Sequence, residues 1–193
     1  MPPVTPAVLI LLVANAIVFA LANTLSDAAI APLALWPVGS GAFEIWQPVS
    51  YGFLHLETMQ LLFNLFGLWM FGAELELLWG RQRFFTLWFA SVVAAGLTQL
   101  LVDFLLGSPN PTLGASGGVF GLLLAFAMMF PERRVLVFFV IPLQARWFAV
   151  LYGLIELYQG VTTTSSGIAH FAHLGGMLGA WITMQFWRRR RLR

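Results

Sequence analysis

The sequence predicts an all-α integral membrane protein, a polytopic bundle of six transmembrane helices. Of its 193 residues, 60% are hydrophobic and only 9% are charged, and the mean hydropathy is +0.84. Soluble domains carry about 25% charged residues, so this chain could not cover its surface in water. Lipid accepts an apolar surface but requires backbone polar groups to be paired within helices or a closed barrel. The long unbroken apolar runs favour helices.

Six apolar segments have the length of membrane helices. A bilayer core about 30 Å thick needs about 20 apolar residues per helix, which selects residues 6–23, 55–79, 84–106, 116–130, 146–158 and 167–187. The fourth and fifth, at about 15 and 13 residues, fall below the usual range of about 17 to 25, so water should reach the first turn of so short a helix. Residues 135–142 are too short to span and should lie along the cytoplasmic membrane surface. The whole chain, 1–193, is expected to form one transmembrane domain.

The first apolar run has no basic segment before it and no clear cleavage signal after it, so we expect it to remain as a helix. The loop that follows, 24–54, carries Trp36 and Trp46 and no basic residue. This composition fits a partly interfacial structure and equally an ordinary amphipathic connector.

The basic residues predict the orientation of the helices. All ten are arginine, and in a six-helix serpentine they fall on one side: Arg81, Arg83, Arg133, Arg134, Arg146, Arg188, Arg189, Arg190, Arg191 and Arg193. The positive-inside rule makes that side cytoplasmic, so both termini should be cytoplasmic and loops 24–54, 107–115 and 159–166 should face outward. Because the arginines lie at segment ends, topology explains the net charge of +2, and no nucleic-acid partner is expected.

A serine among glycines begins the fourth segment. Residues 114–118 read Gly-Ala-Ser-Gly-Gly, and serine acts as a nucleophile only with a base nearby. The histidines of the chain are His55, His170 and His173. His173 lies about 9 Å along the sixth helix, at a depth in the membrane that matches Ser116. Burying an ionisable side chain at this depth is costly, so we expect the histidine to have a function. Taken singly, the serine also fits an ordinary packing motif.

Glycine spacing offers a way to bring these residues together. Small residues four apart let helix backbones approach closely, and this spacing occurs at Gly114 and Gly118, Gly117 and Gly121, and Gly175 and Gly179. If the fourth and sixth helices face each other through these glycines, Ser116 and His173 come within hydrogen-bond reach.

Two amide side chains on the second helix are candidate oxyanion donors. Gln60 and Asn64 are four apart and share one helix face, with His55 a turn and a half earlier. Amide N–H groups on a buried face could bind a developing oxyanion. The alternative is that these polar residues simply pack together.

The motifs resemble those of the rhomboid family of intramembrane serine proteases over nearly the whole chain. Three of them carry the match: Gly-x-Ser-Gly at 114–117, Ala-His-x-x-Gly at 172–176, and His-x-x-x-x-His-x-x-x-Asn at 55–64. Gln60 replaces the second histidine of the last motif, while Glu76 and Gly80 continue the match. The family's Trp-Arg pair is Trp46-Gln47 here, which should remove the arginine's contribution to the first loop.

The resemblance implies an endopeptidase that cleaves transmembrane segments of membrane proteins within the lipid bilayer, in a bacterial plasma membrane. Its Ser-His dyad would consist of Ser116 as nucleophile and His173, not His170, as general base. No acidic third member is expected, because Asp103 sits near an outer helix end and Glu156 has no counterpart in the motifs. No cofactor and no metal are implied.

The resemblance also implies how the oxyanion would be held. The backbone N–H of Ser116 and the side chain of Asn64 would donate to it, with Gln60 as a second candidate. The supporting residues would be Gly114, Gly117 and Phe120, the last packing beside the histidine.

Two other classes of function stay open. The departures at Gln60 and Gln47 motivate a catalytically silent rhomboid-like protein that binds membrane clients. A small channel or transporter would line a pathway with the same polar residues, but no internal repeat supports it. The absence of cysteine excludes disulfides, thiolate catalysis and cysteine-bound metal.

Overall fold

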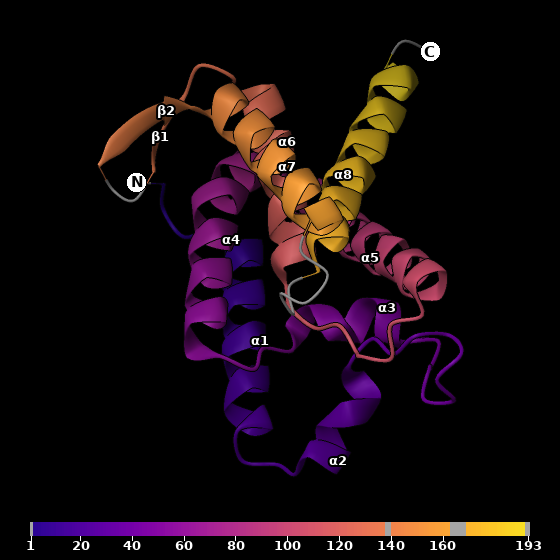
Figure 1. The fold of residues 1–193 in the computed structure, drawn as a ribbon. Coiled ribbons are helices and arrows are strands. Elements are labelled where there is room, and N and C mark those ends of the chain that lie inside the picture. The colour runs from indigo at the N-terminus through magenta and orange to yellow at the C-terminus, as the bar shows by residue number, and fades with distance from the viewer. Residues whose placement is uncertain (1, 138–139, 163–168, 192–193) are drawn as a thin grey trace.

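The computed structural model describes residues 2–137, 140–162 and 169–191. These residues form a bundle of helices with one small hairpin (Figure 1). In chain order the elements are α1 (Pro6–Ala22), α2 (Asp27–Ile30), η1 (Ala31–Leu33), α3 (Gln47–Ser50), η2 (Tyr51–Phe53), α4 (Thr58–Trp79), α5 (Arg81–Leu106), α6 (Ser116–Met129), β1 (Arg134–Val137), β2 (Ile141–Gln144), α7 (Ala145–Thr162) and α8 (His170–Arg191).

Each of the six apolar segments overlaps one of the longer helices, and α6 is short as predicted, with 14 residues. The prediction of a short fifth helix is wrong, since α7 has 18 residues and continues to Thr162. Its last turns pack on α8, where a side-chain carbon on Gly160 would lie 3.0 Å from the Phe171 ring. Glycine has a low helix propensity, but this packing keeps Gly160 and the residues after it in the helix. The first four residues of the outward loop expected at 159–166 therefore belong to α7, and 163–166 lie outside the described residues.

The second and sixth helices also begin later than expected. Glu57, with extended backbone, precedes the first residue of α4, so His55 lies in a loop after η2 and not on the helix face of Gln60 and Asn64. The helix α8 starts at His170, and residues 167 and 168 lie outside the described residues. The helix α5 starts at Arg81, earlier than predicted, directly after Gly80.

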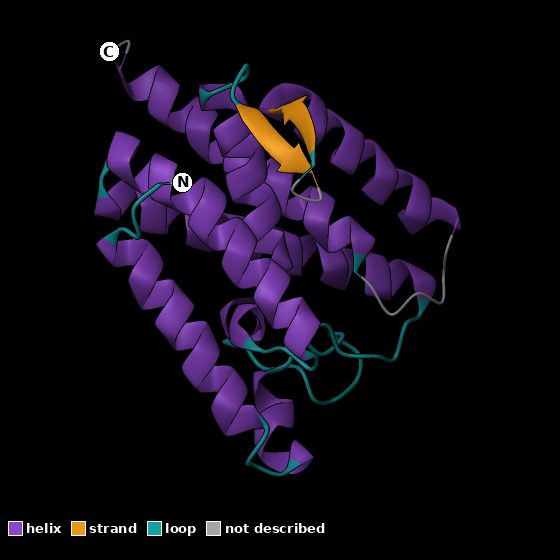
Figure 2. Cartoon of the chain, turned by 90° about the vertical axis from the view of Figure 1, so that its left-hand side faces the viewer, coloured by secondary structure: helices purple, strands orange, loops and turns teal. Residues whose placement is uncertain are grey.

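Within 135–142, the segment expected to lie along the membrane surface, residues 135–137 and 141–142 belong to two antiparallel strands, and 138–139 lie outside the described residues. The strands β1 and β2 pair Arg134 with Gln144 and Val137 with Ile141. Figure 2 shows the hairpin at the end of the bundle where α8 also ends. Pairing satisfies the backbone groups of a segment that is too short to cross a bilayer.

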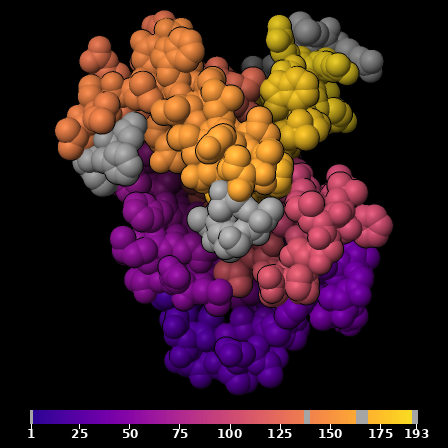
Figure 3. Space-filling view, in the orientation of Figure 1, coloured from indigo at the N-terminus to yellow at the C-terminus, as the bar shows by residue number. Residues whose placement is uncertain are grey.

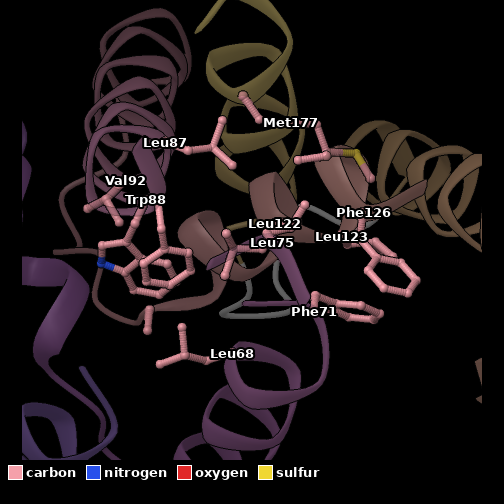
Figure 4. Close-up of a cluster of buried hydrophobic side chains, with 14 of the residues drawn as sticks. Leu68, Phe71, Leu75, Leu87, Trp88, Val92, Leu122, Leu123, Phe126 and Met177 are labelled. Carbon is pink, nitrogen blue, oxygen red and sulfur yellow. The ribbon is translucent and has the colours of Figure 1, made fainter. Parts of the chain in front are cut away.

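A hydrophobic core joins α4, α5, α6 and α8 (Figure 4). Its central side chains include Leu68, Phe71, Leu75, Leu87, Trp88, Val92, Leu122, Leu123, Phe126 and Met177. The outer faces are apolar as well, and on α1 the side chains of Leu9, Ile10 and Ile17 are half exposed. Among the described residues, α4 and α5 are long and apolar enough to cross a membrane, and α1 and α6 are shorter apolar helices. Apolar faces directed away from the core suit lipid.

The first loop is folded and anchored by a glutamine. Gln47 is fully buried. Its Oε1 accepts from the backbone N–H of Trp36 at 3.1 Å, and its Nε2 donates to the carbonyl oxygens of Ala42 at 2.9 Å and Pro32 at 3.3 Å. The contribution of an arginine at this position is absent, as expected, and the amide that replaces it makes three backbone contacts of its own.

Glycines set the crossing of α6 and α8. A side-chain carbon on Gly176 would overlap the carbonyl oxygen of Gly117, so the two backbones touch at this point. A carbon on Gly121, one turn further along α6, would lie 2.9 Å from the carbonyl oxygen of Gly176. Contact of this kind requires residues without side chains.

The predicted pair Gly175 and Gly179 faces a different helix. Carbons added there would meet Thr98 and Ala94 of α5. The fourth and sixth helices therefore meet through Gly117 and Gly176, while the Gly175 and Gly179 face of α8 packs on α5.

Replacing Gly176 by alanine should lower the free energy of unfolding by about 1–3 kcal/mol, because the added carbon meets backbone that cannot move cheaply. Gly153→Ala on α7 is the matched control, since its carbon would meet only the Met177 sulfur at 3.8 Å. That control should be neutral or stabilising by about 0.5–1 kcal/mol. Unfolding of the purified protein in mixed micelles measures both, and a Gly176→Ala protein as stable as the wild type would contradict the crossing.

Candidate active site

Ser116 and His173 lie at hydrogen-bond distance. Ser116 is the first residue of α6, and His173 lies in the first turn of α8. The Ser116 Oγ is 2.8 Å from the His173 Nε2, and the histidine side chain is buried. A hydroxyl can donate its hydrogen to an unprotonated imidazole nitrogen. This is the geometry that allows imidazole to remove a proton from serine.

An aromatic ring holds the plane of the histidine. The Phe120 ring, one turn after Ser116, stacks on the His173 ring with centroids 4.3 Å apart and planes 5° apart. Tyr152 of α7 backs Phe120, with ring centroids 6.1 Å apart. The structure thus brings Phe120 against the histidine, where the resemblance places an aromatic residue.

A carboxylate that the sequence reasoning set aside also reaches this site. Glu156 of α7 is buried, and its Oε2 lies 2.8 Å from the His173 Nδ1 and 2.7 Å from the His170 Nδ1. Figure 3 shows α7 and α8 side by side at the surface of the bundle. The prediction of no acidic third member was based on the motifs alone, and the structure places a carboxylate beside the histidine. The signal that could have found it is a carboxylate inside an apolar helix, which needs a partner.

His55 lies between Asn64 and the start of α6 and contacts both. The Asn64 Nδ2 is 3.1 Å from the His55 Nε2, and the Ala115 backbone N–H lies 3.5 Å from the same nitrogen. Both partners are donors, so this nitrogen is the acceptor and carries no hydrogen. Burial lowers the pKa of His55 to about 4, which keeps the ring neutral at pH 7.

Gln60 lies on the other side of Gly114. Its Nε2 is 3.5 Å from the Leu113 carbonyl oxygen, and its Oε1 accepts from the Leu56 N–H at 3.2 Å. A side-chain carbon on Gly114, whose φ is 129°, would lie 3.0 Å from the Gln60 Nε2 and 3.7 Å from the Ser116 Oγ. Glycine therefore both permits this backbone conformation and leaves open the space between the amide and the serine.

Two surface hollows lie away from this site. One, of ≈ 480 Å³, is lined by residues that include Trp36 and Asp103, and the other, of ≈ 410 Å³, by residues that include Trp79 and Trp187. Ser116 lines neither hollow.

Comparison with known proteins finds similar sequences. The family profile described as Rhomboid domain matches residues 42–190. Rhomboid protein 1, mitochondrial, of Saccharomyces cerevisiae is 35% identical over 133 residues, which are 67% of this chain and 38% of the yeast protein. Rhomboid protease GlpG of Yersinia pestis is 29% identical over 186 residues, which are 96% of this chain and 62% of that protein. The chain therefore spans less than two thirds of the length of these relatives.

Buried His55 should make stability depend on pH. Its pKa is about 4 in the fold against an ordinary value of 6.5, so only the unfolded state binds the proton between these values. Its contribution to the free energy of unfolding is complete above pH 6.5 and decreases as the pH falls toward 4, by about 3 kcal/mol. His55→Gln should flatten this dependence in micelle unfolding experiments between pH 4 and 8. An equal decrease in the variant and the wild type would contradict the assignment.

Proposed function

Because the chain belongs to the rhomboid family, we propose that it is an intramembrane serine endopeptidase with Ser116 as nucleophile and His173 as general base. The observation that carries the proposal is the 2.8 Å separation of the Ser116 Oγ from the His173 Nε2 inside an apolar bundle. A buried ionisable group at membrane depth is expected to have a function. The name of the Yersinia relatives, rhomboid protease, supports the same reaction.

The proposed reaction uses one histidine twice. The Ser116 Oγ attacks the carbonyl carbon of the substrate peptide while the His173 Nε2 accepts the hydroxyl hydrogen. The C–N bond then breaks, and His173 gives that proton to the leaving amine. A water molecule deprotonated by the same histidine hydrolyses the acyl-enzyme and restores the serine. The stacked Phe120 ring keeps the imidazole in one plane during these transfers.

Three donors are proposed for the oxyanion. The N–H of Ser116 belongs to the first turn of α6, whose N–H groups have no acceptor within the helix. The Asn64 amide contacts His55 through one hydrogen and keeps a second on the same nitrogen. The Gln60 amide, beyond Gly114, is the third donor. Such preorganised donors stabilise charge that develops in the transition state.

In the proposed topology, α1, α4, α5, α6, α7 and α8 are six membrane spans of one domain, 1–193. Both termini face the cytoplasm of a bacterium. Contacts between arginine-bearing segments support this arrangement: Arg133 lies 3.6 Å from Glu74 at the end of α4, and Arg83 lies 5.7 Å from the centre of the Trp187 ring on α8. Arginine beside tryptophan is typical of a membrane interface. The substrate is a transmembrane segment of another membrane protein.

Ser116→Ala and His173→Ala should each reduce cleavage of a transmembrane-peptide substrate by about 10³-fold or more, because they remove the nucleophile or its base. The full chain is purified in detergent or reconstituted in liposomes, and product formation is measured directly. Ser91→Ala is the matched control, since Ser91 is buried in α5 and donates to the Leu87 carbonyl at 2.8 Å. It should retain activity.

Labelling by a fluorophosphonate probe separates the protease from the silent alternative. The wild type should be labelled, and labelling should disappear in Ser116→Ala. Undiminished cleavage by Ser116→Ala would contradict the proposal. A wild type that is neither labelled nor active would favour the client-binding protein.

Asn64→Ala should lower kcat by about 10²-fold with little change in KM, because the lost donor acts mainly in the transition state. The loss of kcat in Gln60→Ala, measured in the same way, shows how much each of the two amides contributes to oxyanion stabilisation. His55→Gln controls for the loss of the Asn64 contact with His55. A change in kcat within twofold for Asn64→Ala would show that the residue is structural.

A further inference from the structure

A buried carboxylate with two histidine partners has no role in the reaction proposed above for Ser116 and His173. Glu156 is 7% exposed, although its neighbours Leu154 and Leu157 on α7 are about half exposed. Its Oε2 contacts the Nδ1 atoms of His170 at 2.7 Å and His173 at 2.8 Å. These histidines are three residues apart on α8 and therefore share one face. A carboxylate at this depth requires such partners.

The distances favour direct contact over a shared metal ion. Ligand atoms about 2.0–2.1 Å from a tetrahedral ion would lie about 3.3 Å from one another. The nitrogen-to-oxygen distances of 2.7 Å and 2.8 Å are instead those of hydrogen-bonded or ion-paired groups. The carboxylate therefore acts on the two imidazole rings themselves.

The contact decides which nitrogen of His173 carries the hydrogen. An ionised carboxylate only accepts hydrogen bonds, so the nitrogen 2.8 Å from Glu156 is the protonated one in the neutral ring. The contact is off the line of an ideal hydrogen bond, and the His173 Nδ1 has no other polar partner among the described residues. The opposite nitrogen, Nε2, then presents its lone pair to the Ser116 Oγ at 2.8 Å. That is the tautomer in which the histidine can accept the serine hydrogen.

We propose that Glu156 is a positioning residue for His173, so that the site works as a triad of Ser116, His173 and Glu156. This inference rests on the proposed function. The carboxylate selects the reactive tautomer and stabilises the imidazolium that forms when the serine hydrogen moves to Nε2. His170 contacts the same oxygen and holds the carboxylate in place before the charge develops, which reduces the reorganisation needed during the reaction.

The groups around His173 leave Glu156 as its acidic partner. Glu156 and Tyr152 face it or its stacking partner from α7, His170 lies beside it on α8, and Ser116 faces it from α6. From α5, the residues that pack near Gly175 are Ala94 and Thr98, and neither carries a charge. Among these residues, Glu156 therefore supplies the acceptor for the Nδ1 hydrogen.

The test compares kcat and KM of the purified chain and its variants at pH 7.5. Glu156→Gln should lower kcat by about 10²-fold with KM within threefold, since the wrong tautomer becomes accessible. Glu156→Asp keeps a carboxylate that can accept from Nδ1 and should restore most of the lost kcat.

Asp103→Asn is the matched control, because Asp103 is a buried carboxylate of α5 that accepts from Gln99 at 2.9 Å. Its kcat and KM should match those of the wild type. Glu156→Gln with wild-type kcat would overturn the triad. A loss of kcat that Glu156→Asp does not restore would assign Glu156 a structural role and also overturn it. Cleavage that survives Ser116→Ala would instead refute the proposed function, so the two failures are distinguishable.

Two further measurements do not depend on the folding of the Glu156→Gln variant. Histidine ¹⁵N NMR of the wild type at pH 7.5, with His173 assigned by substitution, should show hydrogen on Nδ1, and hydrogen on Nε2 would overturn the proposal. Activity should be unchanged by EDTA. Loss of activity restored by Zn²⁺ would overturn the triad in favour of a metal site.

Discussion

The site depends on the contact between the backbones of α6 and α8. Where Gly117 meets Gly176, no side-chain atom fits between the helices. This close approach sets the serine at the start of one helix against the histidine in the first turn of the other. Phe120 then uses the remaining space beside the imidazole ring. A larger residue at Gly176 would separate the two helices before it touched any reacting atom, whereas one at Gly117 would meet Ala95 of α5.

Buried polar side chains connect elements that are distant in sequence. Glu76 at the end of α4 accepts from the Thr5 hydroxyl and from the N–H groups of Ala7 and Val8 at the start of α1, where helix N–H groups lack partners. Gln47 ties the first loop together in the same way, and Glu156 ties α7 to α8. In an apolar bundle each such group must find a partner, so these few residues select how the helices are arranged.

The sequence predicted the longer helices well because the bilayer thickness sets their length. It misjudged the end of α7, where Gly160 is held in the helix by Phe171, and the start of α4, where a turn places His55 in a loop. The role of Gln47 was also missed. A motif shows that arginine is absent, but not that the amide in its place contacts backbone groups of the loop.

By itself the sequence determined the membrane class, the family, and the serine and histidine that are candidates for catalysis. Composition and local motifs carry that information, because they do not depend on how one helix rotates against another. Only the tertiary structure decided that Glu156 contacts His173. Helical periodicity assigns each residue to a face, while the neighbour of that face is set by packing between helices. The opposed glycines and the length of α7 together bring the carboxylate to the histidine.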